Sequence, residues 1–331
     1  MKCNFNGTVL ITVLPPVLVT EFVLGLLANG LALWIFCFRL RPWKSSTVLL
    51  FNLAIADFLL NLTLPFHAVY YISKIKWIFG AAFCNIGLLL FAMNRRGSTF
   101  FLMAIAVDRY MRVVHPHHPI NHLSVSKAML GALGLWLVTI SMTAHVLTLQ
   151  QNNTSYCESF MIDSDPRRNF TWHKFAFLFS FLLPLLVILF CTVRITGELR
   201  GRRLAQHAKI KKAMCFLIIV LVVFIICFLP SNITMLIIWI KTKGLASTLS
   251  KSEICPALED LNIAFFITIT LTYLNSVLNP VVYYLSSPIF KGICRKVLHL
   301  PEANTVDSTE KKTRESFSQL GTQNEGNVTR S

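Results

Sequence analysis

Charged residues are scarce in this chain. Of its 331 residues only 14% are Asp, Glu, Lys or Arg, whereas 54% are hydrophobic and Phe alone occurs 26 times. Soluble globular proteins carry about 25% charged residues. For the bulk of the sequence, this composition therefore excludes a soluble enzyme domain, an intrinsically disordered chain and a disulfide-stapled miniprotein.

Acidic residues are scarcer still, because 15 Asp and Glu stand against 31 Lys and Arg and leave a formal charge of +16. In so hydrophobic a chain this excess indicates basic cytoplasmic loops of a membrane protein, with lipids and not nucleic acid as partners. The apolar runs do not alternate with period two, which argues against a membrane β-barrel. HExxH, GxSxG and comparable motifs are missing, which argues against an enzyme.

Long apolar runs are what the chain does have. A bilayer core needs about 20 mostly apolar residues in a helix. Seven runs meet that length, so we predict an all-α membrane protein with a seven-transmembrane helix bundle (14–284). The spans are predicted at 14–39, 47–71, 82–112, 128–148, 173–196, 213–240 and 259–284. The first run is too long for a cleavable signal peptide, so we expect it to remain as a span.

Basic loops set the predicted orientation. Arg39, Arg41 and Lys44 follow the first span, and a larger basic group follows the fifth. Because such loops face the cytoplasm, the N-terminus (1–13) is predicted to be extracellular at the plasma membrane. Glycosylation sequons agree with this orientation. They lie at Asn6, Asn152, Asn153 and Asn169.

Cysteines on the predicted outer side offer disulfides. Four of the nine cysteines lie there: Cys3, Cys84, Cys157 and Cys255. Four cysteines allow three pairings. We favour Cys84 with Cys157, which would draw the second outer loop over the bundle mouth, and Cys3 with Cys255; the alternative is an unpaired Cys3.

Ionisable residues inside a span indicate function by default. Arg95 precedes Arg109 by 14 residues, about four helical turns or roughly 21 Å, so both lie on one stripe of the third span, together with Phe91. Arg96 is turned by about 100° and is expected to meet a neighbouring helix or to snorkel. A permanent cation facing an outer cavity attracts a carboxylate. The alternative, an internal carboxylate on Arg95, finds no acid at that depth in spans four to seven.

Asp57 is a second buried charge. Oxygen-bearing side chains on spans three and seven suit a small hard cation, which favours an allosteric sodium site and no other cofactor; the alternative is a hydrogen-bonded core acid. The predicted sodium ligands are Asp57, Ser98, Asn275 and Asn279. At the inner end of span three, Asp108 is expected to hold Arg109 until a partner competes; the alternative is that Arg109 merely snorkels.

Landmarks on each span, in order, resemble those of the rhodopsin-like G-protein-coupled receptors. They are Asn29 in GLLANG, Asp57 in LAIAD, Cys84, Asp108-Arg109-Tyr110, Trp136, Pro184, the CFLP of 227–230 and the NPVVY of 279–283. The resemblance implies a heterotrimeric G protein and arrestin as partners. It also implies switch residues at Asp108, Arg109, Tyr110, Phe228, Pro230, Pro280 and Tyr283.

A narrower set of strings, among them FAMNRRGS, SYCESF and LTYLNSVL, resembles the hydroxycarboxylic acid receptors and their oxoeicosanoid and hydroxyeicosanoid relatives. That resemblance implies a carboxylate ligand, coupling to inhibitory Gi/o proteins and lowered cyclic AMP, with Arg95 clamping the carboxylate. Implied contacts are Ser159, Phe160, Phe266 and Tyr273, to which we add Phe91, His67 and Lys174.

Departures from the subfamily bear on the ligand. Met235 stands where relatives carry a second basic residue in span six, and His67 where some carry an arginine. Fewer cations favour a longer, more apolar carboxylate such as an oxidised fatty acid. Receptors for short hydroxycarboxylic acids remain an alternative. An anion transporter is the alternative from another class, although no internal repeat is visible.

The C-terminal segments are predicted to lie in the cytoplasm. In 285–300, apolar residues recur at helical spacing and cations fall elsewhere, which predicts an amphipathic helix on the membrane surface. Cys294 on that helix is a candidate for palmitoylation, the alternative being a plain buried thiol. The tail 301–331 is polar and rich in Ser and Thr, which predicts disorder and arrestin recruitment after phosphorylation; the alternative is an inert linker.

Overall fold

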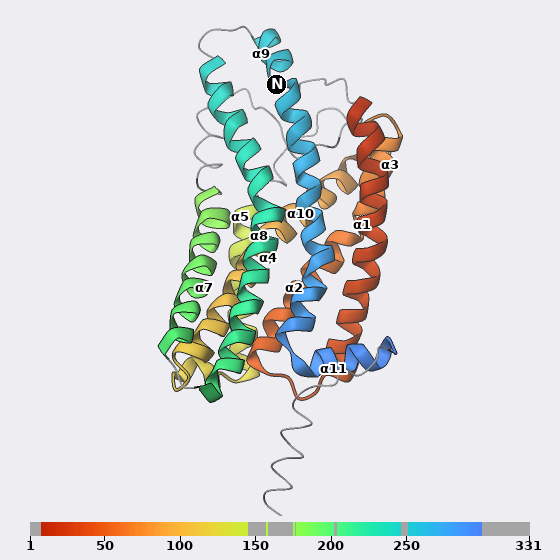
Figure 1. Cartoon of the computed structure of the whole chain (residues 1–331). Coiled ribbons are helices and arrows are strands. Elements are labelled where there is room, and N and C mark those ends of the chain that lie inside the picture. The colour runs from red at the N-terminus through yellow and green to blue at the C-terminus, as the bar shows by residue number, and fades with distance from the viewer. Residues whose placement is uncertain are drawn as a thin grey trace, which may run out of the picture. The chain divides into compact units, whose positions relative to one another are not determined.

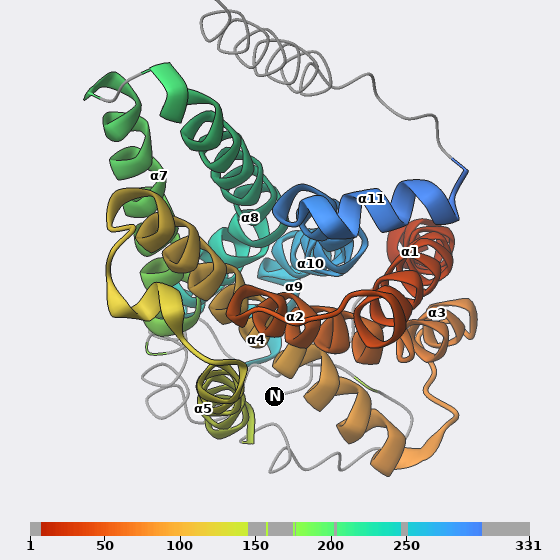
Figure 2. The same cartoon turned by 90° about the horizontal axis from the view of Figure 1, so that it is seen from below.

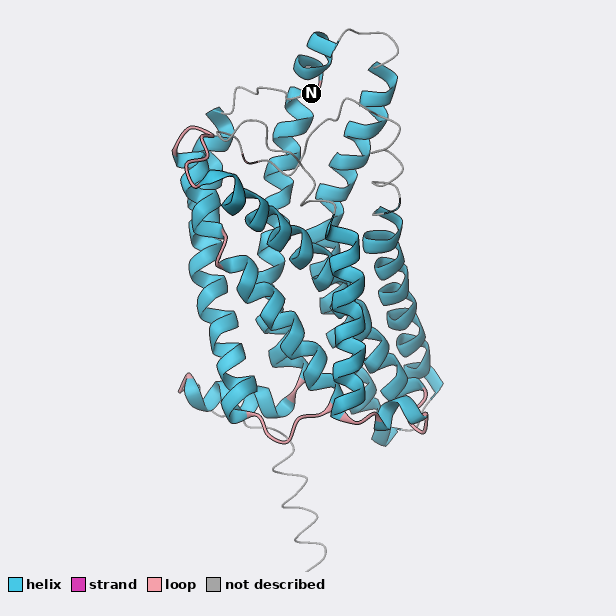
Figure 3. Ribbon diagram, turned by 180° about the vertical axis from the view of Figure 1, so that it is seen from behind, coloured by secondary structure: helices cyan, strands magenta, loops and turns pink. Residues whose placement is uncertain are grey.

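The computed structural model describes residues 8–144, 157, 175, 177–201, 204–245 and 251–299. Across these residues the regular elements are helices and there is no strand (Figures 1 and 3). The α-helices are α1 (Thr8–Trp34), α2 (Ser45–Asn61), α3 (Leu64–Ile72), α4 (Gly80–Val114), α5 (Val125–Thr143), α7 (Leu183–Gly201), α8 (Leu204–Leu245), α9 (Lys251–Ala257), α10 (Glu259–Ser286) and α11 (Pro288–Val297). Short π-helical segments, Ile35–Arg39 and Leu178–Leu182, extend α1 and precede α7.

The seven predicted spans correspond to helices. Six helical segments of the described residues are long and apolar enough to cross a membrane. The seventh is α4, whose 35 residues include several charged side chains that lower its hydropathy. The second span consists of two helices, α2 and α3, because Pro65 has no N–H and interrupts the helix around Leu62 and Thr63. The seven-helix bundle is therefore confirmed, and the chain is a multi-pass membrane protein.

Contacts between helices place α4 against α2, α5, α7 and α8, while α10 packs against α1, α2 and α8. Figure 2 shows this arrangement from below. Gly25 allows α1 to approach α2, because a Cβ at that position would collide with the Asn61 side chain. Large apolar side chains such as Leu27 and Phe38 are exposed on the outside, whereas Asp57 and other polar side chains are buried inside. This distribution suits lipid outside and polar contacts within.

The helix α11 begins after Ser287, which has an extended backbone. The Ser287 hydroxyl accepts a hydrogen bond from the Phe290 N–H at 3.2 Å, and the Phe290 ring lies 5.1 Å from that of Phe36. The predicted segment 285–300 is thus helical from Pro288 to Val297. Cys294 is a half-buried free thiol, and its acylation stays a prediction.

Candidate ligand and switch sites

Arg95 points from α4 toward α8. Its Nη2 donates a hydrogen bond to the Ser231 hydroxyl at 3.2 Å. The two salt bridges among the described residues both involve Asp108, so Arg95 has no acidic partner within 4.0 Å there. A permanently charged guanidinium held by a neutral hydroxyl keeps further N–H donors for an anion.

Arg96, the next residue, lies on another side of α4. Its Nη1 donates to the main-chain carbonyl of Met142 in α5 at 2.7 Å. The expectation that Arg96 meets a neighbouring helix is therefore confirmed. The two adjacent arginines form a natural pair for comparison, because only Arg95 faces α8.

An apolar cluster lies one turn from Arg95. The rings of Phe91 and Tyr273 have centroids 5.0 Å apart. Phe266 belongs to the same cluster, and Met235 packs against it. The structure thus brings three of the sequence-predicted contacts together on α4 and α10.

Of the other predicted ligand contacts, only His67 lies within the described structure. His67 is buried in α3 with its ring 6.0 Å from that of Trp77, and its Nε2 has no hydrogen-bond partner in the described structure. Ser159, Phe160 and Lys174 lie outside the described residues.

Cys84, near the start of α4, forms a disulfide with Cys157, as predicted. Cys3 and the side chain of Cys255 lie outside the described part of the chain, so the second bridge stays a prediction. The four predicted glycosylation sites, Asn6, Asn152, Asn153 and Asn169, also lie outside it.

The Asp57 carboxylate is fully buried and accepts hydrogen bonds from two helices, α4 and α10. The donors are Asn94 Nδ2 at 2.9 Å, Ser98 Oγ at 3.5 Å, Asn279 Nδ2 at 2.7 Å and the Tyr283 hydroxyl at 2.9 Å. Neither Asn94 nor Tyr283 was among the predicted sodium ligands, although Tyr283 was predicted as a switch residue. Each lies four residues from a predicted one on the same helix face, so helical spacing contained a signal for both.

Asn275 does not take part in the hydrogen bonds around Asp57. Its side chain is fully buried, yet neither its Nδ2 nor its Oδ1 has a hydrogen-bond partner among the described residues. The structure therefore brings Asp57, Ser98 and Asn279 together and leaves Asn275 without a bond to the carboxylate.

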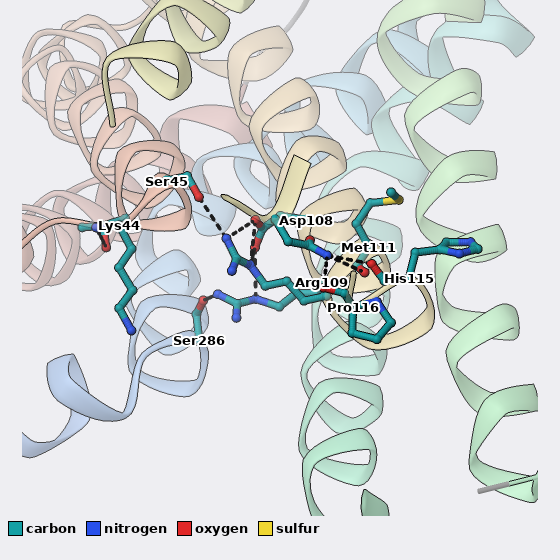
Figure 4. A network of polar contacts seen from close by, with 11 residues as sticks. Lys44, Ser45, Asp108, Arg109, Met111, His115, Pro116 and Ser286 are labelled. Carbon is teal, nitrogen blue, oxygen red and sulfur yellow. Dashed lines mark hydrogen bonds and ion pairs between the residues drawn. The ribbon is translucent and has the colours of Figure 1, made fainter. Parts of the chain in front are cut away.

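At the C-terminal end of α4, Asp108 pairs mainly with Arg112. Figure 4 shows Asp108 beside Arg109, with Ser45 and Ser286 nearby. Arg112 Nε lies 3.0 Å from both carboxylate oxygens, whereas Arg109 Nε is 3.9 Å from Oδ2. The expected contact of Asp108 with Arg109 is thus present as the longer of two ion pairs, and the shorter pair joins Asp108 to Arg112, four residues away on the same helix face.

Arg109 instead reaches α10. Its Nη2 donates to the Ser286 hydroxyl at 2.6 Å, and its guanidinium carbon lies 5.6 Å from the centre of the Phe216 ring in α8. Arg112 also donates to the Ser45 hydroxyl at 2.9 Å. Ser286 and Ser45 come from distant parts of the sequence, so no local pattern could have identified them.

Replacing Arg112 with Ala is expected to lower G-protein activation about two- to fivefold. Asp108 would lose its closer partner and turn to Arg109, and a half-exposed ion pair is worth about 0.5 to 1 kcal/mol. Nucleotide exchange on a purified G protein, with Arg112→Lys as the control that keeps the charge, measures this effect. Equal exchange in Arg112→Ala and the wild type would show that the Asp108–Arg112 pair does not govern Arg109.

The remaining switch landmarks lie inside helices and in contacts between side chains. Pro230 and Pro280 are inside α8 and α10. Phe228 is buried, and its ring lies 5.1 Å from that of Phe224. The Tyr110 hydroxyl lies 3.2 Å from His115 Nε2.

Comparisons with known proteins agree with this geometry. The sequence model of the family described as "7 transmembrane receptor (rhodopsin family)" matches residues 28–283. Hydroxycarboxylic acid receptor 3 of Homo sapiens is 46% identical over 323 residues, which cover 93% of this chain and 81% of that protein.

Two further relatives are named for eicosanoids. Oxoeicosanoid receptor 1 of Homo sapiens is 41% identical, covering 87% of this chain and 72% of that protein. The 12-(S)-hydroxy-5,8,10,14-eicosatetraenoic acid receptor of Mus musculus is 35% identical, covering 90% of this chain and 92% of that protein. The chain therefore belongs to the rhodopsin family of seven-transmembrane receptors, within the subfamily of the hydroxycarboxylic acid and oxoeicosanoid receptors.

Proposed function

We propose that this receptor binds a small carboxylate of the hydroxy or oxidised fatty acid type and couples to inhibitory Gi/o proteins, which lowers cyclic AMP. The observation that carries the proposal is Arg95, a cation inside the bundle whose partner in the described structure is a neutral hydroxyl. A buried arginine pairs with a carboxylate bidentately, which supplies affinity and orientation together.

The surroundings of Arg95 favour an acid with a long apolar part. Met235 packs against the cluster of Phe91, Phe266 and Tyr273, where a second cation would serve a short hydroxy acid better. Each of the relatives reported above is named for a carboxylic acid or an oxidised eicosanoid. Membership of a receptor family stands against the transporter alternative.

A panel of acids tests the ligand class. It runs from lactate to 12-(S)-hydroxy-5,8,10,14-eicosatetraenoic acid, each beside its methyl ester, with cyclic AMP measured with and without pertussis toxin. The proposal predicts that long acids act, that their esters do not, and that the toxin removes the response. Activity of the esters would contradict the carboxylate assignment, and a toxin-resistant response would contradict Gi/o coupling.

Membrane placement and arrestin belong to the same proposal. The N-terminus is extracellular at the plasma membrane, and the tail 301–331, which lies outside the described residues, recruits arrestin once phosphorylated. Truncation after Leu300 is expected to prolong signalling and reduce internalisation, because the Ser and Thr sites are removed. Internalisation at the wild-type rate, measured with an antibody to an N-terminal tag, would count against an arrestin-recruiting tail.

A further inference from the structure

Pro230 leaves the backbone of α8 in need of outside hydrogen bonds. A proline inside a helix has no N–H and pushes away the carbonyl of the preceding turn. In a membrane, hydroxyls of neighbouring helices satisfy such carbonyls. At Pro230 that carbonyl belongs to Ile226, four residues earlier, and the Thr272 hydroxyl of α10 donates to the next carbonyl along α8, that of Cys227, at 3.3 Å.

Ser231 follows this proline and touches both Thr272 and Arg95. Its Oγ lies 3.5 Å from Thr272 Oγ1 and 3.2 Å from the Phe228 carbonyl. It accepts the hydrogen bond from Arg95 Nη2 at 3.2 Å. Both hydroxyl side chains are fully buried, so water does not replace these partners easily.

The number of protons on each group decides the direction of these hydrogen bonds. A hydroxyl has one proton, and that of Thr272 is used on the Cys227 carbonyl, so Thr272 can only accept from Ser231. Arg95 has donors alone, so Ser231 must accept from it. The single Ser231 proton is shared between the Phe228 carbonyl at 3.2 Å and Thr272 Oγ1 at 3.5 Å. The contacts therefore run from Arg95 through Ser231 to both groups and end on the α8 backbone within the turn before Pro230.

We propose that Ser231 and Thr272 form a hydroxyl relay that couples the occupancy of Arg95 by a ligand carboxylate to the Pro230 region of α8. The proposal rests on the proposed function, because it takes Arg95 as the carboxylate anchor. A carboxylate that binds the guanidinium draws Nη2 away from Ser231, and the hydrogen bonds around Pro230 rearrange. Ligand binding thereby biases two arrangements of α8. Ser231 and Thr272 are positioning residues, since they act through Arg95 and the backbone.

Removing the Ser231 hydroxyl should imitate the ligand. In the ligand-free receptor, Ser231→Ala is expected to raise basal nucleotide exchange about tenfold, the effect of losing a hydrogen bond to a charged group. Arg95→Ala is expected to raise it similarly. The double variant is expected to rise no further than either single one, because both changes remove the same contact.

Matched variants separate the relay from general damage to the fold. Ser231→Thr and Thr272→Ser keep the hydroxyls and are expected to show wild-type basal exchange, while Thr272→Val is expected to raise it. Thr242→Val is the control on α8, because the Thr242 hydroxyl donates to the Ile238 carbonyl of its own helix at 2.7 Å, about three turns from Pro230. It is expected to leave basal exchange unchanged.

The experiment uses the full chain in nanodiscs, with purified G-protein heterotrimers of each major class in separate reactions and exchange normalised to folded receptor. Non-additive rises in Ser231→Ala and Arg95→Ala support the relay. Wild-type basal exchange in Ser231→Ala, or additive rises in the double variant, would overturn it. Failure of the acid panel beside a non-additive rise would instead remove the ligand proposal alone.

Discussion

Replacing Arg95 with Ala is expected to reduce the potency of a carboxylate agonist by at least about tenfold while surface expression persists. Truncating one member of a desolvated charge pair costs about 2 to 5 kcal/mol, much of it from the charge left without its partner. In the free receptor Arg95 faces the Ser231 hydroxyl and no acid of the described residues. The charge pair that Arg95→Ala removes is therefore the one with the ligand.

Arg96→Ala is the matched control for this prediction. Arg96 carries the same charge one residue away, but it donates to the Met142 carbonyl in α5. Its removal is expected to change potency much less than removal of Arg95. Concentration–response curves for cyclic AMP, corrected for surface receptor and basal activity, give the comparison. Equal potency losses in the two variants would mean that Arg95 has no particular role in the pocket.

Asp57→Asn is expected to abolish the effect of sodium on agonist affinity. The carboxylate is the formal negative charge among the predicted sodium ligands, and the amide that replaces it has none. The change also places an N–H₂ group among four donors, which costs about 1 to 3 kcal/mol where a donor loses its acceptor. Reduced thermal stability should accompany the loss of sodium sensitivity.

The measurement compares agonist affinity in washed membranes with sodium or with an organic cation at equal ionic strength. Asn52→Ala is the control, because the Asn52 amide is hydrogen-bonded to the Val48 carbonyl and Trp136 Nε1 and is not one of the predicted sodium ligands. We expect that variant to keep its sodium dependence. Sodium dependence that survives in Asp57→Asn would identify Asp57 as a hydrogen-bonded core acid only.

The seven spans were predictable because each depends on a local apolar run, which a bilayer converts into a helix. The position of Arg95 and Arg109 on one side of α4 was also predictable, since a helix has 3.6 residues per turn and the two residues are about four turns apart. In the structure both arginines indeed contact α8, through Ser231 and Phe216. The break at Pro65 had a local signal that the continuous apolar run concealed.

Partners across helices were not predictable in the same way. Ser231, Thr272 and Ser286 are ordinary polar residues in sequence, and their roles depend on which helices pack together. The Asp108–Arg112 pair, in contrast, had helical spacing as a signal and was overlooked.

Glu21 was also missed. It lies in α1, is buried, and its Oε2 has no hydrogen-bond partner among the described residues. The absence of an acid from spans four to seven does not extend to α1, where Glu21 lies. Its neighbours Leu18 and Phe22 lie with the cluster of Phe91, Phe266 and Tyr273, so the interior near the proposed pocket holds a carboxyl group.

The most direct measurement is a binding cycle between the ligand carboxylate and Arg95. The affinities of the most potent acid of the panel and of its methyl ester are measured on the purified wild type and on Arg95→Ala. If the carboxylate binds Arg95, esterification weakens binding at least about tenfold in the wild type and has little effect in the variant. An equal loss on esterification in both proteins would show that another residue receives the carboxylate.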